Sequence, residues 1–337
     1  MTMTTEALDI LGRIFKAGTL SLLLCLFIYP YYIRYLKWRS LGQQIRNDGP
    51  ENHYAKKDTP TMGGILIIVV ALICAGLFLG QHISLYYYVF TAMVLGTMGI
   101  GLIDDLSKII KKKSLGLKAR EKLILQILLA CFLVFFILKY TGIDTTIRVP
   151  FLGIIDSTIF FWFFTVFVVV GTINAVNLTD GLDGLAAGTC AVGFLAYMVI
   201  CYKNEQFDLA ISSFAMCCAC VGFLWFNAYP AKIFMGDTGS LALGAGLATL
   251  AVFTRTEFLL IIIGGIFVAE TLSVLIQVTY FKLTGGKRIF KMSPLHHHFE
   301  KSGWHEVEVT IRFWIIALML SVMGLIIYFR EFLLFTA

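Results

Sequence analysis

Long apolar runs alternate with short polar segments along almost the whole chain. Most runs approach ~20 residues, the length that an α-helix needs to cross the hydrocarbon core of a bilayer. The pattern therefore predicts an all-α polytopic membrane protein with about ten transmembrane helices. The predicted spans are 17–36, 61–80, 86–103, 122–140, 158–177, 184–202, 209–226, 239–254, 257–283 and 311–330.

The ninth predicted span, 257–283, is longer than a membrane crossing requires. As a straight helix it would extend about 40 Å, whereas the hydrocarbon core is about 30 Å thick. The segment must therefore tilt strongly or break, and Gly264-Gly265 is the candidate break. The stretch 145–155, "TTIRVPFLGII", is expected to form a short hairpin.

Composition agrees with the pattern, since 58% of the residues are hydrophobic, only 14% are charged and the mean hydropathy is +0.84. No long polar stretch is left for a second domain, so residues 1–337 are interpreted as one transmembrane domain. Arg13 and Lys16 before an apolar run resemble a signal peptide, but no small-residue cleavage site follows, and the run is kept as the first span. The eight cysteines lie inside apolar runs, which is typical of core residues in a reduced environment.

The basic residues predict the orientation of the chain. Most of the 27 Lys and Arg lie in the connections after spans 1, 3, 5, 7 and 9. Because positive charge collects on the cytoplasmic side, these connections are expected to face the cytoplasm and both termini to face outward.

The unusual polar motifs lie in the same connections. A transporter more often places ionisable groups at mid-membrane, on broken helices. Here the acids lie at span ends on one side, which favours a reaction at the membrane surface between a soluble reactant and a lipid. The motifs are "HYAKKDTPTMGG" (53–64), "GLIDDLSK" (101–108), "NAVNLTDGLDG" (174–184), "WFNAYPAKIFMGDTGS" (225–240) and "SPLHHHFEKSGW" (293–304).

Several aspartates in these motifs predict a cation site. Asp180 and Asp183 would share a face if their segment is helical, and Gly239 and Ser240 would open the eighth helix with free N–H groups. Carboxylates gathered on one face repel unless a cation neutralises them, and hard oxygen ligands suit Mg²⁺. The aspartates are Asp104, Asp105, Asp180, Asp183 and Asp237.

Nearby basic residues, Lys56, Lys108 and Lys111–Lys113, would attract an anionic substrate. Acids and bases together indicate phosphoryl transfer, in which a protein mainly positions reactants and neutralises charge. The alternative is that the acids only cap helix ends. Repetition of the pattern in four connections on one side weighs against it, although topology alone accounts for the Lys111–Lys113 run.

Two other motifs are less specific. The glycines of "GTMGIG" (96–101) follow no predicted strand, so they indicate helix packing rather than dinucleotide binding. The run His296–His298 could bind a metal, arise by chance or bind an anion. Zinc needs converging ligands, and no Cys or Asp lies close in sequence. The basic residues upstream, Lys287, Arg288 and Lys291, favour anion binding.

Taken together, the motifs closely resemble those of the polyprenyl-phosphate N-acetylhexosamine-1-phosphate transferases, in the same order and over essentially the whole chain. The Asp-Asp pair and the Asn-x-x-Asp-Gly-x-Asp-Gly element belong to this superfamily at large. "PTMGG" and "SPLHHHFE" are narrower and point to its muramoyl-pentapeptide branch. One departure is Asp58, where the family usually has Gly.

The resemblance implies ten helices, outward termini, a bent ninth helix, a homodimer and a cytoplasmic active site in a bacterial inner or plasma membrane. The implied reaction moves phospho-MurNAc-pentapeptide from UDP-MurNAc-pentapeptide to undecaprenyl phosphate, giving lipid I and UMP with Mg²⁺ in peptidoglycan synthesis. Membrane lipid is an implied partner, and nucleic acid is not.

The resemblance also implies roles for single residues. Asp237 would hold the metal, Asp104 would act as base or orienting group, and Asp105 would support metal or phosphates. Asp183 would recognise the uracil base, and Phe234 would stack on the uracil ring. Other residues implied in the pocket are Lys56, Thr61, Lys108, Asn174, Asn177, Asp180, Gln277, His296 and His297.

Several alternatives stay open from the sequence. The lipid phosphate attacks the β-phosphorus directly, or an aspartate attacks first and forms a phospho-enzyme; direct attack is favoured because the lipid phosphate is already a nucleophile. A sister transferase would use UDP-GlcNAc or another UDP-N-acetylhexosamine. A cation or proton transporter and a nucleotide-binding scaffold without turnover are the hypotheses from other classes.

Overall fold

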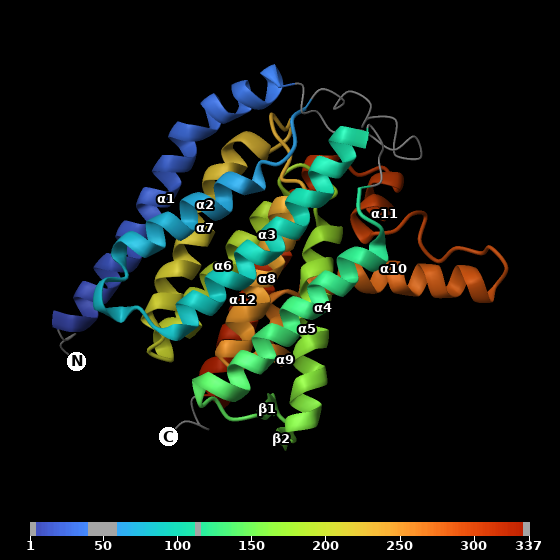
Figure 1. The fold of residues 1–337 in the computed structure, drawn as a ribbon. Coiled ribbons are helices and arrows are strands. Elements are labelled where there is room, and N and C mark those ends of the chain that lie inside the picture. The colour runs from blue at the N-terminus through green and yellow to red at the C-terminus, as the bar shows by residue number, and fades with distance from the viewer. Residues whose placement is uncertain (1–4, 40–58, 112–115, 333–337) are drawn as a thin grey trace.

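The computed structural model describes residues 5–39, 59–111 and 116–332 (Figure 1). Lys56, assigned to the pocket by resemblance, lies outside these residues. The described helices are α1 Thr5–Trp38, α2 Gly64–Phe78, α3 Leu85–Lys111, α4 Ala119–Phe136, α5 Thr158–Thr179, α6 Leu185–Lys203, α7 Phe207–Asn227, α8 Asp237–Phe253, α9 Glu257–Ile263, α10 Gly265–Leu283, α11 Leu295–Lys301 and α12 Glu306–Ile327.

These helices confirm the predicted fold class. In the described part of the chain, eight helices are long and apolar enough to cross a membrane, and α2 and α8 are shorter apolar helices. Every one of the ten predicted spans coincides with a helix or, for the ninth, with a pair of helices. The boundaries differ most at the start of α1, which is Thr5 and not residue 17, and at the end of α3, which is Lys111 and not residue 103.

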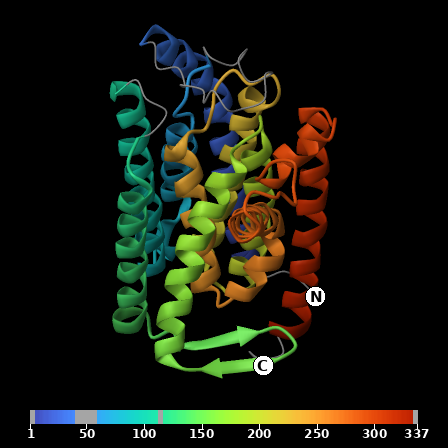
Figure 2. The same ribbon diagram turned by 90° about the vertical axis from the view of Figure 1, so that its right-hand side faces the viewer.

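The predicted break in the ninth span is confirmed. α9 ends at Ile263 and α10 begins at Gly265. Gly264 between them leaves no room for a side chain, because a Cβ there would lie 2.8 Å from the Leu260 carbonyl oxygen. After the break α10 leaves the bundle and extends to one side of it in Figure 1, and Figure 2 views it end-on.

The predicted hairpin is also confirmed, and it marks one end of the molecule. β1 (Thr146–Val149) pairs antiparallel with β2 (Gly153–Asp156). In Figures 1 and 2 this hairpin lies at the end of the bundle where α1 begins and α12 ends. The connections from α5 to α6 and from α7 to α8 lie at the opposite end, so the polar motifs gather away from the hairpin.

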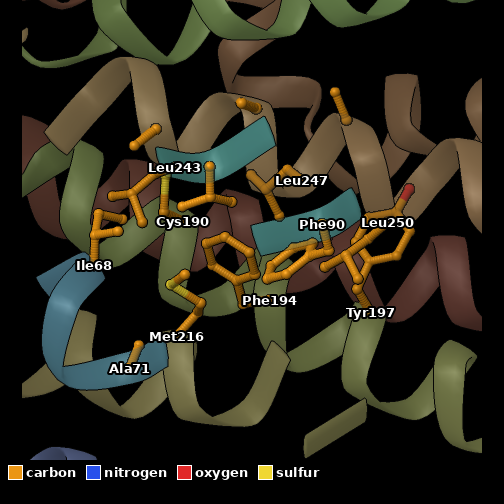
Figure 3. Close-up of a cluster of buried hydrophobic side chains, with 14 of the residues drawn as sticks. Ile68, Ala71, Phe90, Cys190, Phe194, Tyr197, Met216, Leu243, Leu247 and Leu250 are labelled. Atoms are coloured by element: carbon orange, nitrogen blue, oxygen red, sulfur yellow. The ribbon is translucent and has the colours of Figure 1, made fainter. Parts of the chain in front are cut away.

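α8 forms the centre of the core. Its residues are almost all fully buried, and it packs against α2, α3, α5 and α6. Small residues along "GSLALGAGLATLA" allow this close approach; a Cβ on Gly244, for example, would lie 2.7 Å from the Ile173 Cα of α5. Leu243, Leu247 and Leu250 of α8 interleave with Phe194 and other apolar side chains (Figure 3).

Two close backbone contacts bring the polar motifs of other segments next to the start of α8. Gly101 of α3 lies so close that a Cβ would meet the Asp237 carbonyl carbon at 2.5 Å. The segment around Gly63 pairs with the segment before α8, since Gly63 N–H donates to Phe234 O and Phe234 N–H donates to Pro60 O, both at 2.8 Å. The glycines of "TMGIG" and "PTMGG" therefore allow three segments to meet.

Candidate active site

Three of the five predicted aspartates converge at the start of α8. Asp104 and Asp105 come from α3, and Asp237 is the first residue of α8. Each offers one carboxylate oxygen, and the three oxygens lie within 4.8 Å of one another. We call Asp104, Asp105 and Asp237 the acidic cluster.

Asp105 links the two helices of the cluster. Its Oδ2 accepts hydrogen bonds from Thr238 N–H at 3.0 Å and from the Thr238 hydroxyl at 2.7 Å, and its Oδ1 accepts from Asp237 N–H at 3.3 Å. A carboxylate at a helix N-terminus satisfies free amides and interacts favourably with the helix dipole. Asp105 therefore fixes the position of Asp237 as well as contributing charge.

The prediction of free N–H groups at Gly239 and Ser240 is wrong. Both amides donate to the carbonyl oxygen of Gly236, at 3.1 Å, because the helix begins two residues earlier than expected. The first-turn amides that remain are those of Asp237 and Thr238, and Asp105 binds them. The start of α8 is thus occupied by a carboxylate of the protein itself.

Two lysines lie among the carboxylates. Lys108 Nζ lies 2.7 Å from Asp104, 3.5 Å from Asp105 and 3.3 Å from Asp237. Lys122 Nζ, from the first turns of α4, lies 2.9 Å from Asp237 and 3.5 Å from Asp104. We call Lys108 and Lys122 the lysine pair. Three carboxylates face two ammonium groups, which leaves one negative charge in excess.

The sequence did not single out Lys122, because one more lysine in a basic connection carries no distinct signal. Lys108 was assigned to the pocket by resemblance, and its role there stays a prediction. The structure places its ammonium group directly against the acidic cluster.

The carboxylates differ in access. The side chains of Asp104 and Asp105 are 0% and 3% exposed, whereas that of Asp237 is 16% exposed. Asp104 Oδ1 also accepts the Leu117 N–H at 2.8 Å. Asp237 is therefore the most accessible carboxylate of the cluster, and Asp104 and Asp105 also brace the loop and helix around it.

The two asparagines of "NAVNLTDGLDG" have different surroundings. Asn177 Nδ2 donates to Asp237 Oδ1 at 3.1 Å and to the Ser240 hydroxyl at 2.8 Å, so it belongs to the cluster. Asn174 Nδ2 donates to Gln126 Oε1 of α4 at 2.6 Å and so joins α5 to α4. Its predicted place in the pocket stays a prediction.

Asp180 and Asp183 do not share a helical face, because α5 ends at Thr179 and a turn follows, so the condition for that face is not met. Burial, together with the negative charges of Asp237 and Asp105, raises the pKa of Asp180 to about 8. Asp180 therefore lies within electrostatic reach of the acidic cluster.

Asp183 is held by neighbouring backbone. Its Oδ2 accepts the Ala231 N–H at 2.9 Å, while its own N–H donates to Glu306 Oε1 of α12 at 2.8 Å. Asp183 thus braces the loop before α8. The role of reading uracil stays a prediction, and Glu306 is a partner that the sequence analysis missed.

Thr61 and Phe234 lie near the cluster on the paired segments. A Cβ on Gly236, which has a φ of +76°, would lie 2.9 Å from Thr61 Oγ1 and 2.6 Å from Asp105 Oδ2. Thr61 is therefore next to the cluster, and its place in the substrate pocket stays a prediction. Phe234 is partly exposed, and its stacking role stays a prediction.

The residues predicted near α10 and α11 form a separate group. Gln277 Oε1 accepts from Ile289 N–H at 3.1 Å and Phe290 N–H at 3.0 Å, so it orders the segment after α10. His297 Nδ1 lies 2.7 Å from Glu300 Oε2. His296 is buried, and its Nδ1 lies 3.0 Å from Glu270 Oε2, a residue that the sequence analysis did not assign.

The donor set of the acidic cluster fits Mg²⁺. Asp104, Asp105 and Asp237 offer carboxylate oxygens, the ligand type that Mg²⁺ prefers. Together with the lysine pair, these three carboxylates leave one negative charge in excess. Asp237 and Asp105 are the residues predicted to hold the ion, and they lie side by side in the cluster.

Comparison with known proteins identifies the family. The sequence model of glycosyl transferase family 4 matches residues 85–255, and a phospho-N-acetylmuramoyl-pentapeptide-transferase signature matches residues 56–68. A phospho-N-acetylmuramoyl-pentapeptide-transferase of Anoxybacillus flavithermus is 44% identical over 93% of this chain and 97% of its own length. Proteins of the same name from Bacillus velezensis and Bacillus licheniformis are each 46% identical, over 91% of this chain and 95% of theirs.

The first match covers the acidic cluster, and the second covers Thr61 and the paired glycines after it. Identity of this level over nearly the full length of each relative establishes common descent. The chain therefore belongs to the phospho-N-acetylmuramoyl-pentapeptide-transferase family, within glycosyl transferase family 4.

Proposed function

We propose that this protein transfers phospho-MurNAc-pentapeptide from UDP-MurNAc-pentapeptide to undecaprenyl phosphate, forming lipid I and UMP in peptidoglycan synthesis. The observation that carries the proposal is the acidic cluster with its lysine pair, at one end of a bundle of membrane helices. Such a site suits a diphosphate substrate and a cation. The names of relatives 44% and 46% identical to this chain support the choice of substrate.

The protein is a multi-pass membrane protein, and we place it in the bacterial plasma membrane with the acidic cluster on the cytoplasmic side. The bias of Lys and Arg supports this orientation. A cytoplasmic site also suits the reactants, because a UDP-sugar is soluble while the lipid acceptor approaches within the bilayer. The homodimer is proposed from the resemblance alone.

The chain's own residues bind and orient the phosphates. Asp237 and Asp105 would hold Mg²⁺, which when bound would neutralise charge on the diphosphate and make its phosphorus easier to attack. Lys108 and Lys122 would then be free to bind phosphate oxygens, since Asp237, which both lysines contact, would face the ion instead. Asp180 and Asn177 complete the polar wall beside Asp237.

The proposed step is a direct displacement. An oxygen of undecaprenyl phosphate attacks the β-phosphorus of the UDP-sugar, a new P–O bond forms, and the bond to UMP breaks with its electron pair going to UMP. A phosphate monoester is largely ionised at neutral pH, since its second pKa is about 6. The demand on a base is therefore small, and Asp104 would mainly orient the acceptor.

The test is release of UMP from UDP-MurNAc-pentapeptide with undecaprenyl phosphate, measured with and without Mg²⁺ in a folded, detergent-solubilised sample. We expect release that requires both the lipid and the ion. UDP-GlcNAc in place of the donor is the specificity control, and release from it alone would assign the chain to the sister activity. No release from either donor would contradict the proposal, and a trapped phosphosugar adduct on Asp104 or Asp105 would replace direct attack by the covalent route.

A further inference from the structure

Glu270 is a buried carboxylate in the middle of the predicted span 257–283. It lies on α10, its side chain is 0% exposed, and nothing in the proposed reaction uses it. An ionisable group inside a membrane segment is costly and usually serves a function through a specific partner. The partner of Glu270 is His296 on α11.

One carboxylate holds both the backbone and the ring of His296. Glu270 Oε1 accepts the His296 backbone N–H at 3.1 Å, and Glu270 Oε2 lies 3.0 Å from His296 Nδ1. Opposite a carboxylate, Nδ1 is best used as a donor, so the proton of a neutral ring lies on Nδ1. The lone pair is then on Nε2, at the other edge of the ring.

That other edge points at the turn beside the acidic cluster. Within the described residues His296 Nε2 is buried and has no hydrogen-bond partner. It lies against Gly181, where any Cβ would overlap it, and Gly181 directly follows Asp180. A buried polar atom left unpaired costs about 1–3 kcal/mol, so the position favours a bound molecule that supplies a donor.

We propose that Glu270 is a positioning residue for the transferase: it holds His296 as the Nδ1–H tautomer, so that Nε2 accepts a hydrogen bond from an O–H or N–H group of the bound UDP-sugar. The inference rests on the proposed function for the identity of the ligand. The dyad itself rests only on the contacts of Glu270, His296 and Gly181.

The tautomer can be measured directly by ¹⁵N NMR of histidine-labelled protein, in which the His296 signals are assigned as those lost in His296→Gln. We expect the wild type to carry its proton on Nδ1. Glu270→Gln keeps the size of the side chain and an oxygen for the backbone N–H, but its amide donates to Nδ1. The proton should therefore move to Nε2, and Nε2 can then no longer accept a hydrogen bond from the ligand.

Glu270→Gln should also lower kcat for UMP release by about 10- to 100-fold, the usual cost of losing a residue that orients a functional histidine. On a His296→Gln background it should cost nothing further, because the two residues act as a unit. Glu270→Asp keeps the carboxylate and should retain the Nδ1–H tautomer and part of the activity. Glu308→Gln, the same change at an exposed site on α12, is the matched control and should alter neither.

A wild-type spectrum with the proton on Nε2, or on both ring nitrogens, would overturn the proposal even if Glu270→Gln failed to fold. Unchanged kcat in a folded Glu270→Gln variant would overturn it as well. A wild type that releases no UMP would contradict the proposed function instead, and the NMR result would still decide the geometry of the dyad.

Discussion

Lys122 offers the sharpest test of the acidic cluster, because its removal should weaken the metal-free protein and strengthen cation binding. Its Nζ lies 2.9 Å from Asp237 and 3.5 Å from Asp104. At an effective dielectric constant of about 20, these distances correspond to gross attractions of about 6 and 5 kcal/mol. Desolvation of the charges offsets much of this, and breaking a buried pair costs about 3–5 kcal/mol net.

Lys122→Met should therefore lower the melting temperature of the metal-free protein, measured in EDTA, by roughly 6–20 °C at about 2–4 °C per kcal/mol. Mg²⁺ should then raise the melting temperature of the variant more than that of the wild type, because an ammonium group no longer competes for Asp237. A tenfold gain in affinity would add about 1.4 kcal/mol at saturating ion. Turnover should nevertheless fall, since a phosphate-binding charge is lost.

Lys122→Met should lower the stability of the metal-free protein and raise its affinity for Mg²⁺. If Lys122 had only a structural role, the affinity for Mg²⁺ would not rise. Lys139→Met makes the same change just past the far end of α4, where Lys139 contacts the rings of Phe135 and Tyr140, and should leave the response to Mg²⁺ unchanged. If Mg²⁺ shifts the melting temperature of Lys122→Met no more than that of the wild type, the ion does not bind at the acidic cluster.

Three further predictions follow from the same site. Asp237→Asn removes the excess charge and should lower UMP release at least ~100-fold and reduce the Mg²⁺-induced shift in melting temperature; retained activity would assign the ion to another carboxylate. Asp180→Asn should stabilise the metal-free protein relative to the wild type, and increasingly so as pH rises from about 4 to 8. The wild type loses stability over this range because its Asp180 pKa is raised to about 8, so that folding takes up a proton. Equal melting temperatures of variant and wild type at pH 8 would contradict this. Gly236→Ala should cost about 1–3 kcal/mol and weaken Mg²⁺ binding, because φ is +76° and a Cβ would press on Asp105; an unchanged melting temperature would refute that contact.

The membrane spans, the break in the ninth span and the acidic cluster could be predicted, because each follows from a sequence pattern with one dominant physical cause. Run length predicts the spans because a bilayer has a fixed thickness, and the same thickness makes 257–283 too long to stay straight. The convergence of Asp104, Asp105 and Asp237 was predictable because like charges at span ends on one side need a common counter-ion.

The errors arise where local backbone geometry decides. Gly236 adopts a positive φ and α8 starts early, so the amides left free of helix bonds are those of Asp237 and Thr238 instead of the predicted Gly239 and Ser240. Likewise, α5 stops at Thr179, so Asp180 and Asp183 lie on a turn and contact different neighbours. A shift of two residues in a helix boundary lies within the uncertainty of any sequence pattern, yet it decides which groups are free.

Glu270 bears on the choice between a transferase and a transporter. Acids at span ends speak against transport, but Glu270 lies at mid-span and is an exception. A proton or ion relay would need Glu270 to face other ionisable groups across the membrane. Both of its oxygens instead contact His296, on the same side of the molecule as the turn at Gly181. The exception therefore does not favour transport, because the buried acid contacts a histidine that lies against Gly181, next to Asp180.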